Sequence, residues 1–404
     1  MDNFNVCGIV CEYNPFHKGH IYQIQKAKER TKADFVIAVM SGNFVQRGEP
    51  AIINKWARTE MAIKGGADLV IELPAPFALA SAEFFAHGAV NILKSTGIVT
   101  HLSFGSESFD GKNGAEKIAD FAQKDVEIDK NILEKGLSYA AAVKNEMDIL
   151  PNDMLGIEYA RAANRMNFYP VIEPIKRVGS NHDMKGSAKY IRNSIVLKEN
   201  NNGDIDYDLI SNLMPDFAAE ILIKEFKEGR GPVFTENIEN IILADLRRKR
   251  PEDIRNCAYV SEGIEYKIIS EALKNNSFVE IVKACTSKRY TSSRIRRIIF
   301  AALLGIDKNI IKKDVPYIRV LGMNKKAGEL VTAIKERATK PIIISKAEFL
   351  KKYYADNRCE NADIIDFLNI ENNATEIYSL GYPSKKQRVG ASEMTHPLVF
   401  LERN

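Results

Sequence analysis

The sequence lacks the features that would place the protein in a membrane or direct it out of the cell. No apolar run approaches the roughly 20 residues that a membrane-spanning helix needs. The residues from Met1 to Asn5 contain neither the basic nor the apolar region of a secretory signal. We therefore expect a soluble protein of the cytoplasm that makes no contact with a membrane.

Cysteine is scarce and scattered. The chain has five cysteines, and no two of them stand in the C-x-x-C spacing that begins many zinc sites. Cys7 and Cys11 both fall in an apolar, strand-like pattern, where small core residues are more common than a metal or redox pair. We therefore interpret the cysteines as reduced thiols and assign no metal ligand.

An excess of charge of one sign is also missing, because 57 Lys and Arg against 53 Asp and Glu leave a formal net charge of only +4. Total charge therefore says little about partners, and its distribution must be examined instead. With 404 residues, 45% of them hydrophobic, the chain can bury a substantial core and is long enough for two or three domains. It contains no repeat of fixed period and no low-complexity tract.

The first part of the chain alternates short β-branched runs with longer helical patterns. This alternation is typical of βαβ units and predicts an α/β fold with a Rossmann-like parallel sheet. Right-handed crossovers would place the strand-to-helix loops at one edge of the sheet, where ligands bind. Strands are expected at 6–12, 34–40, 68–72 and 99–104, and helices at 21–30, from about 55, and at 83–93.

Beyond about residue 110 helical patterns dominate, with one more strand expected at 171–178 and a helix at 187–198. The polar stretch 198–204 has the composition of a linker. We therefore predict an α/β domain at 1–200 and a mainly helical domain at 201–404. Short strand-like runs predict a small α/β element in the tail, at 317–321, 341–345 and 375–380.

The motif His17-Lys18-Gly19-His20 lies where the first strand meets the first helix. Gly19 permits close approach of the backbone to a ligand, and a helix N-terminus carries partial positive charge. Two imidazoles in the first helical turn can face one pocket, and each can donate a hydrogen bond to a phosphate oxygen. Such donors stabilise the charge that develops during adenylyl transfer. A purely structural pair of turn histidines is the alternative.

Strand, turn and HxGH together resemble the superfamily of nucleotidylyltransferases and class I aminoacyl-tRNA synthetases. The resemblance implies an ATP-binding Rossmann-like domain in which His17 and His20 contact the triphosphate. That superfamily also has a basic or Ser/Thr-rich loop that closes over the phosphates. The candidates for this loop are 176–180 and 186–192, although the usual Ser-Ser or Lys-Met-Ser form is absent.

Longer strings resemble the tRNA(Met) cytidine acetate ligase family: residues 10–20, 40–51, 66–74, 152–159 and 290–297. The resemblance implies acetylation of N4 of the wobble cytidine in elongator tRNA(Met), using acetate and ATP through an acetyl-adenylate. ATP is then a substrate, with Mg²⁺ expected to accompany it. The chemistry is consistent, because acetate cannot acylate an amine until its oxygen becomes a leaving group, which adenylation provides.

Under this resemblance the nucleotide contacts come from one segment, namely Val10, Cys11, Glu12, Tyr13, Asn14, Pro15, Phe16, His17, Lys18, Gly19 and His20. By position we extend them to Gly105, Asn152 and Arg177. Each extension has an ordinary alternative: a turn glycine for Gly105, a helix cap for Asn152 and a surface arginine for Arg177.

Four polar residues follow the second expected strand, at the ligand edge of the sheet: Ser41, Asn43, Gln46 and Arg47. We predict that they contact the substrate, with Arg47 suited to the acetate carboxylate or a phosphate. A solvated loop is the alternative. Asp68 and Glu72 flank the third strand, where capping or pairing with lysine is more common than binding magnesium, so neither is assigned to a metal.

Two basic clusters stand out beyond residue 240. One is the run 247–250, and the other begins at Lys288 and Arg289 and continues through Arg294, Arg296 and Arg297. On a helix, the three arginines would form a stripe able to follow a phosphate backbone, with Tyr290 placed to stack on a base. We therefore predict that domain 201–404 binds RNA, although solvated basic helix faces are common.

Two other functions remain open at this point. A small-molecule nucleotidyltransferase would transfer AMP to a phosphorylated metabolite, but its catalytic core could be more compact than this chain. A non-catalytic RNA-binding protein could keep ATP as a structural ligand, but the intact histidine pair argues against it. The RNA-modifying ligase is the preferred interpretation, and the sequence does not indicate the oligomeric state.

Overall fold

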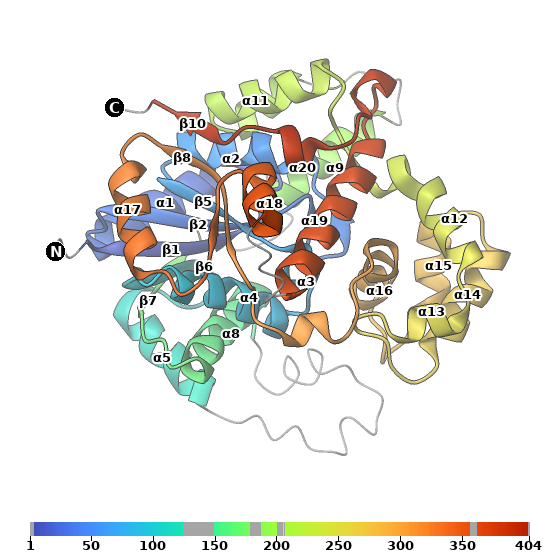
Figure 1. Ribbon diagram of the computed structural model, residues 1–404, viewed down its shortest axis with the longest axis horizontal. Helices are drawn as coiled ribbons and strands as arrows, with labels where there is room; N and C mark the ends of the chain where they lie inside the picture. Colours follow the sequence, from blue (N-terminus) through green and yellow to red (C-terminus); the bar gives the residue numbers. More distant parts are fainter. Residues whose placement is uncertain are drawn as a thin grey trace.

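The computed structural model describes residues 4–123, 149–177, 187–199, 205, 207–355 and 362–402. Within them, eight strands form one sheet with the order β10-β8-β5-β2-β1-β6-β7, and β9 pairs with β8 (Figure 1). The strands are β1 (Val6–Cys11), β2 (Phe35–Ser41), β5 (Leu69–Leu73), β6 (His101–Ser106), β7 (Val171–Lys176), β8 (Ile318–Asn324), β9 (Ile342–Ile343) and β10 (Val399–Leu401).

The central strands are parallel and buried on both faces, as their nearly continuous apolar sequences require. Alternate residues of β1 enter different cores: Val6 and Val10 pack on one face, while Cys7, Ile9 and Cys11 pack on the other. The second face is covered by α1 (Lys18–Thr31), α2 (Lys55–Lys64) and α11 (Asp216–Lys227). The first is covered by α4 (Ala82–Ser95), α8 (Pro151–Arg165) and α17 (Ala327–Arg337).

The α/β prediction is confirmed, together with each of the N-terminal strands to within a few residues. The strand order reverses between β1 and β6, because β2 lies on one side of β1 and β6 on the other. In open parallel sheets this switch point opens a crevice at the carboxyl ends of the strands, where nucleotides bind. The turn that follows β1 therefore lies at the expected ligand edge.

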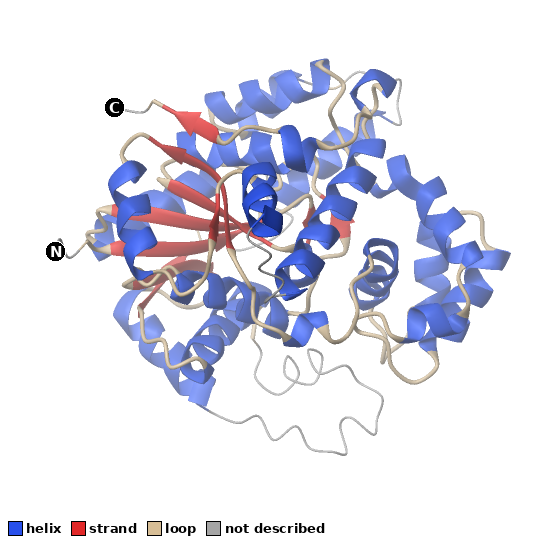
Figure 2. Cartoon of the chain, viewed as in Figure 1, coloured by secondary structure: helices blue, strands red, loops and turns tan. Residues whose placement is uncertain are grey.

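Helices make up a separate group on the right of Figure 2, where no strand of the large sheet reaches. They are α12 (Glu239–Arg248), α13 (Pro251–Arg255), α14 (Ile264–Lys274), α15 (Phe278–Cys285) and α16 (Ser292–Leu304). The other helices are α3 (Ala75–Ala78), α5 (Gly111–Gln123), α9 (Ala188–Glu199), α10 (Tyr207–Leu213), α18 (Lys346–Ala355), α19 (Ala362–Leu380) and α20 (Ser392–Thr395). The short segments are β3 (Phe44–Val45), β4 (Glu49–Pro50), η1 (Thr235–Ile238), η2 (Ile310–Lys312) and η3 (Lys385–Gln387).

The tail differs from expectation in two ways. Its strands do not form a sheet of their own, because β8 pairs antiparallel with β5 and β10 pairs with β8, so both extend the N-terminal sheet. The expected strand at 375–380 is wrong, since these residues complete α19, whose Phe367, Ala374 and Tyr378 are buried. Tertiary packing here overrides the local β-branched pattern.

The predicted linker at 198–204 lies mostly outside the described residues, and the domain boundary near residue 200 stays a prediction. No helix in the described part of the chain is long and apolar enough to cross a membrane.

Candidate active site at the carboxyl ends of β1 and β6

The two histidines of the HxGH motif cap α1 reciprocally. His17 is the N-cap residue, and its Nδ1 accepts a hydrogen bond from the Gly19 backbone N–H at 3.1 Å. His20 Nδ1 in turn accepts from the His17 backbone N–H at 3.1 Å. The rings stack with centroids 3.7 Å apart. Because both Nδ1 atoms are acceptors, each neutral ring carries its proton on Nε2 and keeps that N–H as a donor.

Burial keeps both imidazoles neutral. Burial lowers the pKa of His17 to about 4, and the nearby positive charge of Arg177 acts in the same direction. Burial also lowers the pKa of His20 well below its ordinary value, with His17 and Arg177 adding to the effect. The rings of Tyr13 and Phe16 lie 4.8 and 5.4 Å from that of His20 and fix its orientation. The pair therefore presents two neutral N–H donors at neutral pH.

Gly19 is needed for this arrangement. A Cβ at this position would come within 2.9 Å of His17 Cε1, closer than carbon atoms approach in proteins. Any larger residue would displace the ring of His17 from its capping position. The glycine of the motif therefore makes room for the imidazole, in addition to any ligand.

The structure brings Gly105 and Arg177 to the same edge as the histidines. Gly105 lies near the end of β6, and Arg177 directly follows β7, where its backbone N–H donates to Ser106 O at 2.9 Å. A Cβ on Gly105 would lie 3.3 Å from Arg177 Cγ, so the two residues are neighbours. The influence of Arg177 on both histidine pKa values places its charge near their rings.

Asn152 is not the cap of the neighbouring helix. The N-cap of α8 is Leu150, and Asn152 Nδ2 donates to the carboxylate of Glu107, whose other oxygen accepts the Asn152 backbone N–H at 3.1 Å. Asp153 completes this turn by accepting the backbone N–H groups of Glu107 and Ser108 at 2.9 and 3.2 Å. Glu107 and Asp153, for which the sequence predicts no role, hold the end of β6 against the start of α8.

The loop after β2 is joined to the nucleotide segment through Glu12. Its Oε1 accepts the Gln46 backbone N–H at 2.8 Å. Gln46 and the exposed Arg47 form the tip of the β3–β4 hairpin, where Gly48 has a φ of +75° that favours glycine. Both predicted substrate residues therefore lie beside the segment that contains the HxGH motif.

Ser41 and Asn43 are buried below this tip. Asn43 Oδ1 accepts the Lys55 backbone N–H at 2.9 Å, and its Nδ2 donates to Thr375 Oγ1 at 3.1 Å. Its polar atoms are therefore engaged within the protein, which supports a positioning role for Asn43. The Ser41 hydroxyl is fully buried and has no hydrogen-bond partner among the described residues.

A fully buried arginine joins the ends of β1 and β2. Arg58 donates through Nη1 to Glu12 O at 2.7 Å and to Ser41 O at 3.0 Å, through Nη2 to Gly42 O, and through Nε to Ile53 O at 3.1 Å. A planar guanidinium can make these separate contacts at once, which an ammonium group cannot. Arg58, which the sequence analysis overlooked, therefore fixes the two segments relative to each other.

A buried ion network supports the same loop. Lys55 is 0% exposed and pairs with Glu72 at 2.5 Å and with Glu393. Burial opposes the charge of Lys55, but Glu393 and Glu72 outweigh it and raise the pKa of Lys55 to about 12. Glu72 therefore pairs with a lysine, and Asp68 Oδ2 accepts the Val36 backbone N–H at 2.8 Å. No group of three or more potential ligands in the described residues could hold a metal ion.

The comparisons with known proteins agree with this geometry. A family model described as HIGH Nucleotidyl Transferase matches residues 4–393. A tRNA(Met) cytidine acetate ligase of Acetivibrio thermocellus is 38% identical, over 98% of this chain and 100% of its own. One from a Thermoanaerobacter species is 40% identical with the same coverage. The chain belongs to the tRNA(Met) cytidine acetate ligase family.

A solved family member also shares the fold. The structure of Thermotoga maritima TmcAL bound with alpha-thio ATP matches with a TM-score of 0.87 and 33% identity, covering 99% of this chain and 100% of that one. That protein binds an ATP analogue. The superfamily and family that the sequence strings resembled are therefore confirmed.

In the present chain, the arginines of the predicted stripe contact other parts of the protein. Arg294 donates to Tyr259 O at 3.2 and 2.9 Å and to Ser261 Oγ at 3.0 Å. Arg297 is mostly buried and reaches Gln46 O at 3.5 Å, while Arg296 lies over the Phe278 ring at 5.3 Å. Backbone carbonyls therefore occupy donors of Arg294 and Arg297, while Arg296 stacks on an aromatic ring. RNA binding by the three arginines stays a prediction.

Some of the remaining basic residues are exposed, and others bond to carbonyl or carboxylate groups of the protein. Lys288 and Arg289 are exposed, with Arg289 paired to Glu262. Tyr290 is only 7% exposed and its hydroxyl lies 3.0 Å from Ser261 Oγ, so its proposed stacking on a base is wrong. In the run 247–250, Arg247 bonds to backbone carbonyls, and Lys249 and Arg250 pair with aspartates.

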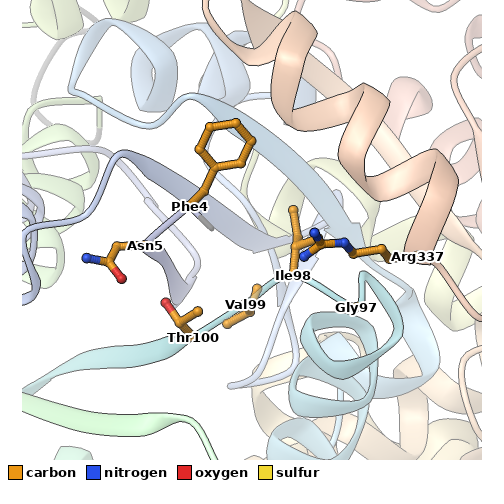
Figure 3. A pocket seen from close by; sticks show the side chains of 7 residues that line it. All are labelled: Phe4, Asn5, Gly97, Ile98, Val99, Thr100 and Arg337. Carbon is orange, nitrogen blue, oxygen red and sulfur yellow. The ribbon is translucent and has the colours of Figure 1, made fainter. Parts of the chain in front are cut away.

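Two other regions bear on the location of the site, namely the candidate phosphate loops and a cavity. Of the two candidate phosphate loops, 178–180 of the first and 186 of the second lie outside the described residues. Residues 188–192 of the second form the start of α9, where the Arg192 guanidinium donates to Asn14 O at 2.6 Å. A cavity of about 270 Å³ lies at the amino ends of β1 and β6, at the opposite edge from the histidines. Figure 3 shows its lining, which consists of Phe4, Asn5, Gly97, Ile98, Val99, Thr100 and Arg337. This cavity is therefore separate from the candidate active site.

Proposed function

We propose that the protein is an ATP-dependent ligase that acetylates N4 of the wobble cytidine in elongator tRNA(Met). The observation that carries the proposal is the pair of neutral imidazoles that cap α1 at the sheet's switch point, each with Nε2–H available. Membership of the family supplies the substrates, since its relatives are named tRNA(Met) cytidine acetate ligases. The cytoplasmic location stays a prediction.

The first step forms acetyl-adenylate. An acetate oxygen attacks the α-phosphorus of ATP, the bond to the β-phosphate oxygen breaks, and pyrophosphate leaves. His17 and His20 donate Nε2–H to phosphoryl oxygens as negative charge gathers there, and Arg177 adds a positive charge beside them. Because both histidines are neutral donors, neither has to gain or lose a proton in this step.

The second step transfers the acetyl group. The cytidine N4 amine attacks the acetyl carbonyl carbon, the bond from that carbon to the AMP oxygen breaks, and the amine loses a proton. The products are N4-acetylcytidine, AMP and pyrophosphate, with one proton released. We assign the ATP contacts to the segment from Val10 to His20 together with Gly105, Asn152 and Arg177.

The acceptor side is assigned to the loop after β2. Arg47 is exposed beside Glu12 and suits the acetate carboxylate, and the Ser41 hydroxyl has no hydrogen-bond partner among the described residues. Gln46 and Asn43 hold the loop in place. Mg²⁺ is expected with ATP, but the described residues form no built site for it, so no step is assigned to the ion. Lys288 and Arg289 remain candidate RNA contacts.

Labelled substrates test this proposal. Acetate labelled on its carbon should reach tRNA only when ATP is present, and nucleoside mass spectrometry should find it on cytidine N4. His20→Ala should abolish the product, while Lys64→Ala, which removes a surface ion pair with Glu60, should not. Retention of labelled AMP on a small metabolite, with no acetyl group on RNA, would contradict the ligase and support a small-molecule nucleotidyltransferase.

A further inference from the structure

The turn after α19 exposes a cluster of cations that the sequence analysis passed over. Lys385 and Lys386 are exposed in η3, and Arg388 follows them, with its Nε bonded to Tyr382 O at 2.7 Å. The Ser384 backbone N–H donates to Gly229 O at 3.1 Å, which places this turn against the C-terminal end of α11. Both lie at the upper right of Figure 1.

The last turn of α11 adds two more cations. Lys224 and Lys227 are exposed and one helical turn apart, so they share a face of α11. We call the surface formed by Lys224, Lys227, Lys385, Lys386 and Arg388 the α11–η3 surface. Two segments about 160 positions apart in the sequence therefore contribute to one basic region.

The charges of the α11–η3 surface are not neutralised nearby. None of its five cations forms an ion pair with another described residue, whereas the neighbouring acids Glu225 and Glu228 are both paired with Arg230. Glu220, one turn before Lys224, is exposed but makes no ion pair with it. Of the five, Arg388 donates to Tyr382 O and Lys227 lies 5.5 Å from the centroid of the Tyr207 ring. Arg294 and Arg297, in contrast, are partly buried with donors directed to protein carbonyls.

Helix α11 also connects this surface to the nucleotide segment. At its start, the Phe217 ring lies 5.9 Å from the Phe16 ring, and in the preceding helix Asn212 O accepts from Lys18 Nζ at 3.0 Å. Phe217 and Lys227 are ten positions apart, which at about 1.5 Å per residue is a span of about 15 Å. One strand of a DNA duplex advances roughly 3.4 Å per phosphate, and on that scale the span corresponds to four or five nucleotides.

We propose that the α11–η3 surface binds the phosphate backbone of the RNA substrate, four or five nucleotides away from the base that enters the active site. This inference rests on the proposed function for the identity of that base. In a tRNA whose modified cytidine lies in the anticodon loop, such phosphates belong to the adjoining stem. The surface contributes affinity and register, while the chemistry stays at the histidine pair.

Paired lysine substitutions test the surface from both segments. Lys385→Ala with Lys386→Ala, and separately Lys224→Ala with Lys227→Ala, should each weaken binding of unmodified tRNA. A plot of log affinity against log salt has a negative slope. Each pair of substitutions should make that slope shallower by about 1.4 to 1.8, because each lost phosphate contact reduces its magnitude by about 0.7 to 0.9. The matched control is Lys325→Ala with Lys335→Ala, two exposed lysines at the far end of the sheet, which should leave the slope unchanged.

A second measurement separates folding and catalysis from RNA binding. The proposed first step does not involve tRNA, so both paired variants should carry out acetate-dependent exchange of pyrophosphate into ATP at the rate of the unsubstituted protein. An unchanged salt slope in the paired variants, or an equal loss in the control, would overturn the proposed surface. Absence of acetate-dependent exchange in the unsubstituted protein would instead overturn the proposed function. The salt dependence of tRNA binding in the variants and the control would still decide whether the α11–η3 surface binds RNA.

Discussion

Replacing His17 by asparagine separates the two tasks that the imidazole performs. Its Nδ1 caps α1 by accepting the Gly19 N–H at 3.1 Å, and its Nε2–H is free to donate to phosphate. Asparagine is among the best N-cap residues, and its Oδ1 can replace Nδ1 as the acceptor. His17→Asn should therefore keep the cap and remove only the phosphate donor.

The magnitudes follow from these contacts. Loss of one preorganised donor at a developing oxyanion costs about 3 to 4 kcal/mol, so acetate-dependent pyrophosphate exchange should slow by about 10²- to 10³-fold. The free energy of unfolding in urea should fall by no more than about 1.5 kcal/mol, which is the range for an aromatic pair such as the stacked rings. His17→Ala should lose about 1 kcal/mol more, because the cap also disappears. Exchange at the unsubstituted rate in His17→Asn would refute the assignment of Nε2–H to phosphate.

Three further outcomes are expected. Because burial lowers the pKa of His17 to about 4 and an unfolded imidazole titrates near 6.5, the unfolded chain takes up a proton first as pH falls. The free energy of unfolding should be complete above about pH 6.5 and decline towards pH 4, and His17→Asn should reduce that decline; a profile identical to the unsubstituted protein would contradict the shift. Lys55→Met should lower the free energy of unfolding in urea by about 3 to 5 kcal/mol, because it leaves the buried carboxylates of Glu72 and Glu393 without their cation. Lys64→Met should change the free energy of unfolding by less than about 0.5 kcal/mol. Arg294→Ala should lower the free energy of unfolding by about 1 to 3 kcal/mol and leave the salt dependence of tRNA binding unchanged. A salt dependence shallower by about 0.7 to 0.9 would instead show that Arg294 contacts the RNA.

Local patterns were sufficient for the N-terminal half of the sheet and for the position of the histidine pair. Strands such as β1 and β2 are short, apolar and bounded by turn residues, so their existence and the ligand edge can be read from neighbouring positions. The spacing of His17 and His20 shows that both can face one pocket. It does not show that each Nδ1 is taken by a backbone N–H, which decides the tautomer.

Long-range pairing explains most of what the sequence did not reveal. Val70 pairs with Gly322 across some 250 residues, and no local pattern says that a tail strand will join the first sheet. The same holds for the contact of Lys55 with Glu393 and for the carbonyls that accept from Arg58. These contacts unite residues from distant segments.

The direction of a charged side chain is also invisible in spacing. Arg294 and Arg297 fall on one face of α16, but that face meets Tyr259 O and Gln46 O rather than solvent. The exposed cations Lys385 and Lys386 are a short pair in a tail turn, which has no helical periodicity to attract notice. A basic run therefore indicates charge, while the tertiary neighbours decide whether that charge is available to RNA.

The role of the histidine pair can be tested in a crystal of this protein soaked with alpha-thio ATP. We expect Nε2 of His17 and Nε2 of His20 each to lie about 2.7 to 3.2 Å from a phosphoryl oxygen, with both Nδ1 atoms still bonded to the backbone. A nucleotide bound with both Nε2 atoms directed to protein groups, or at another edge of the sheet, would contradict it.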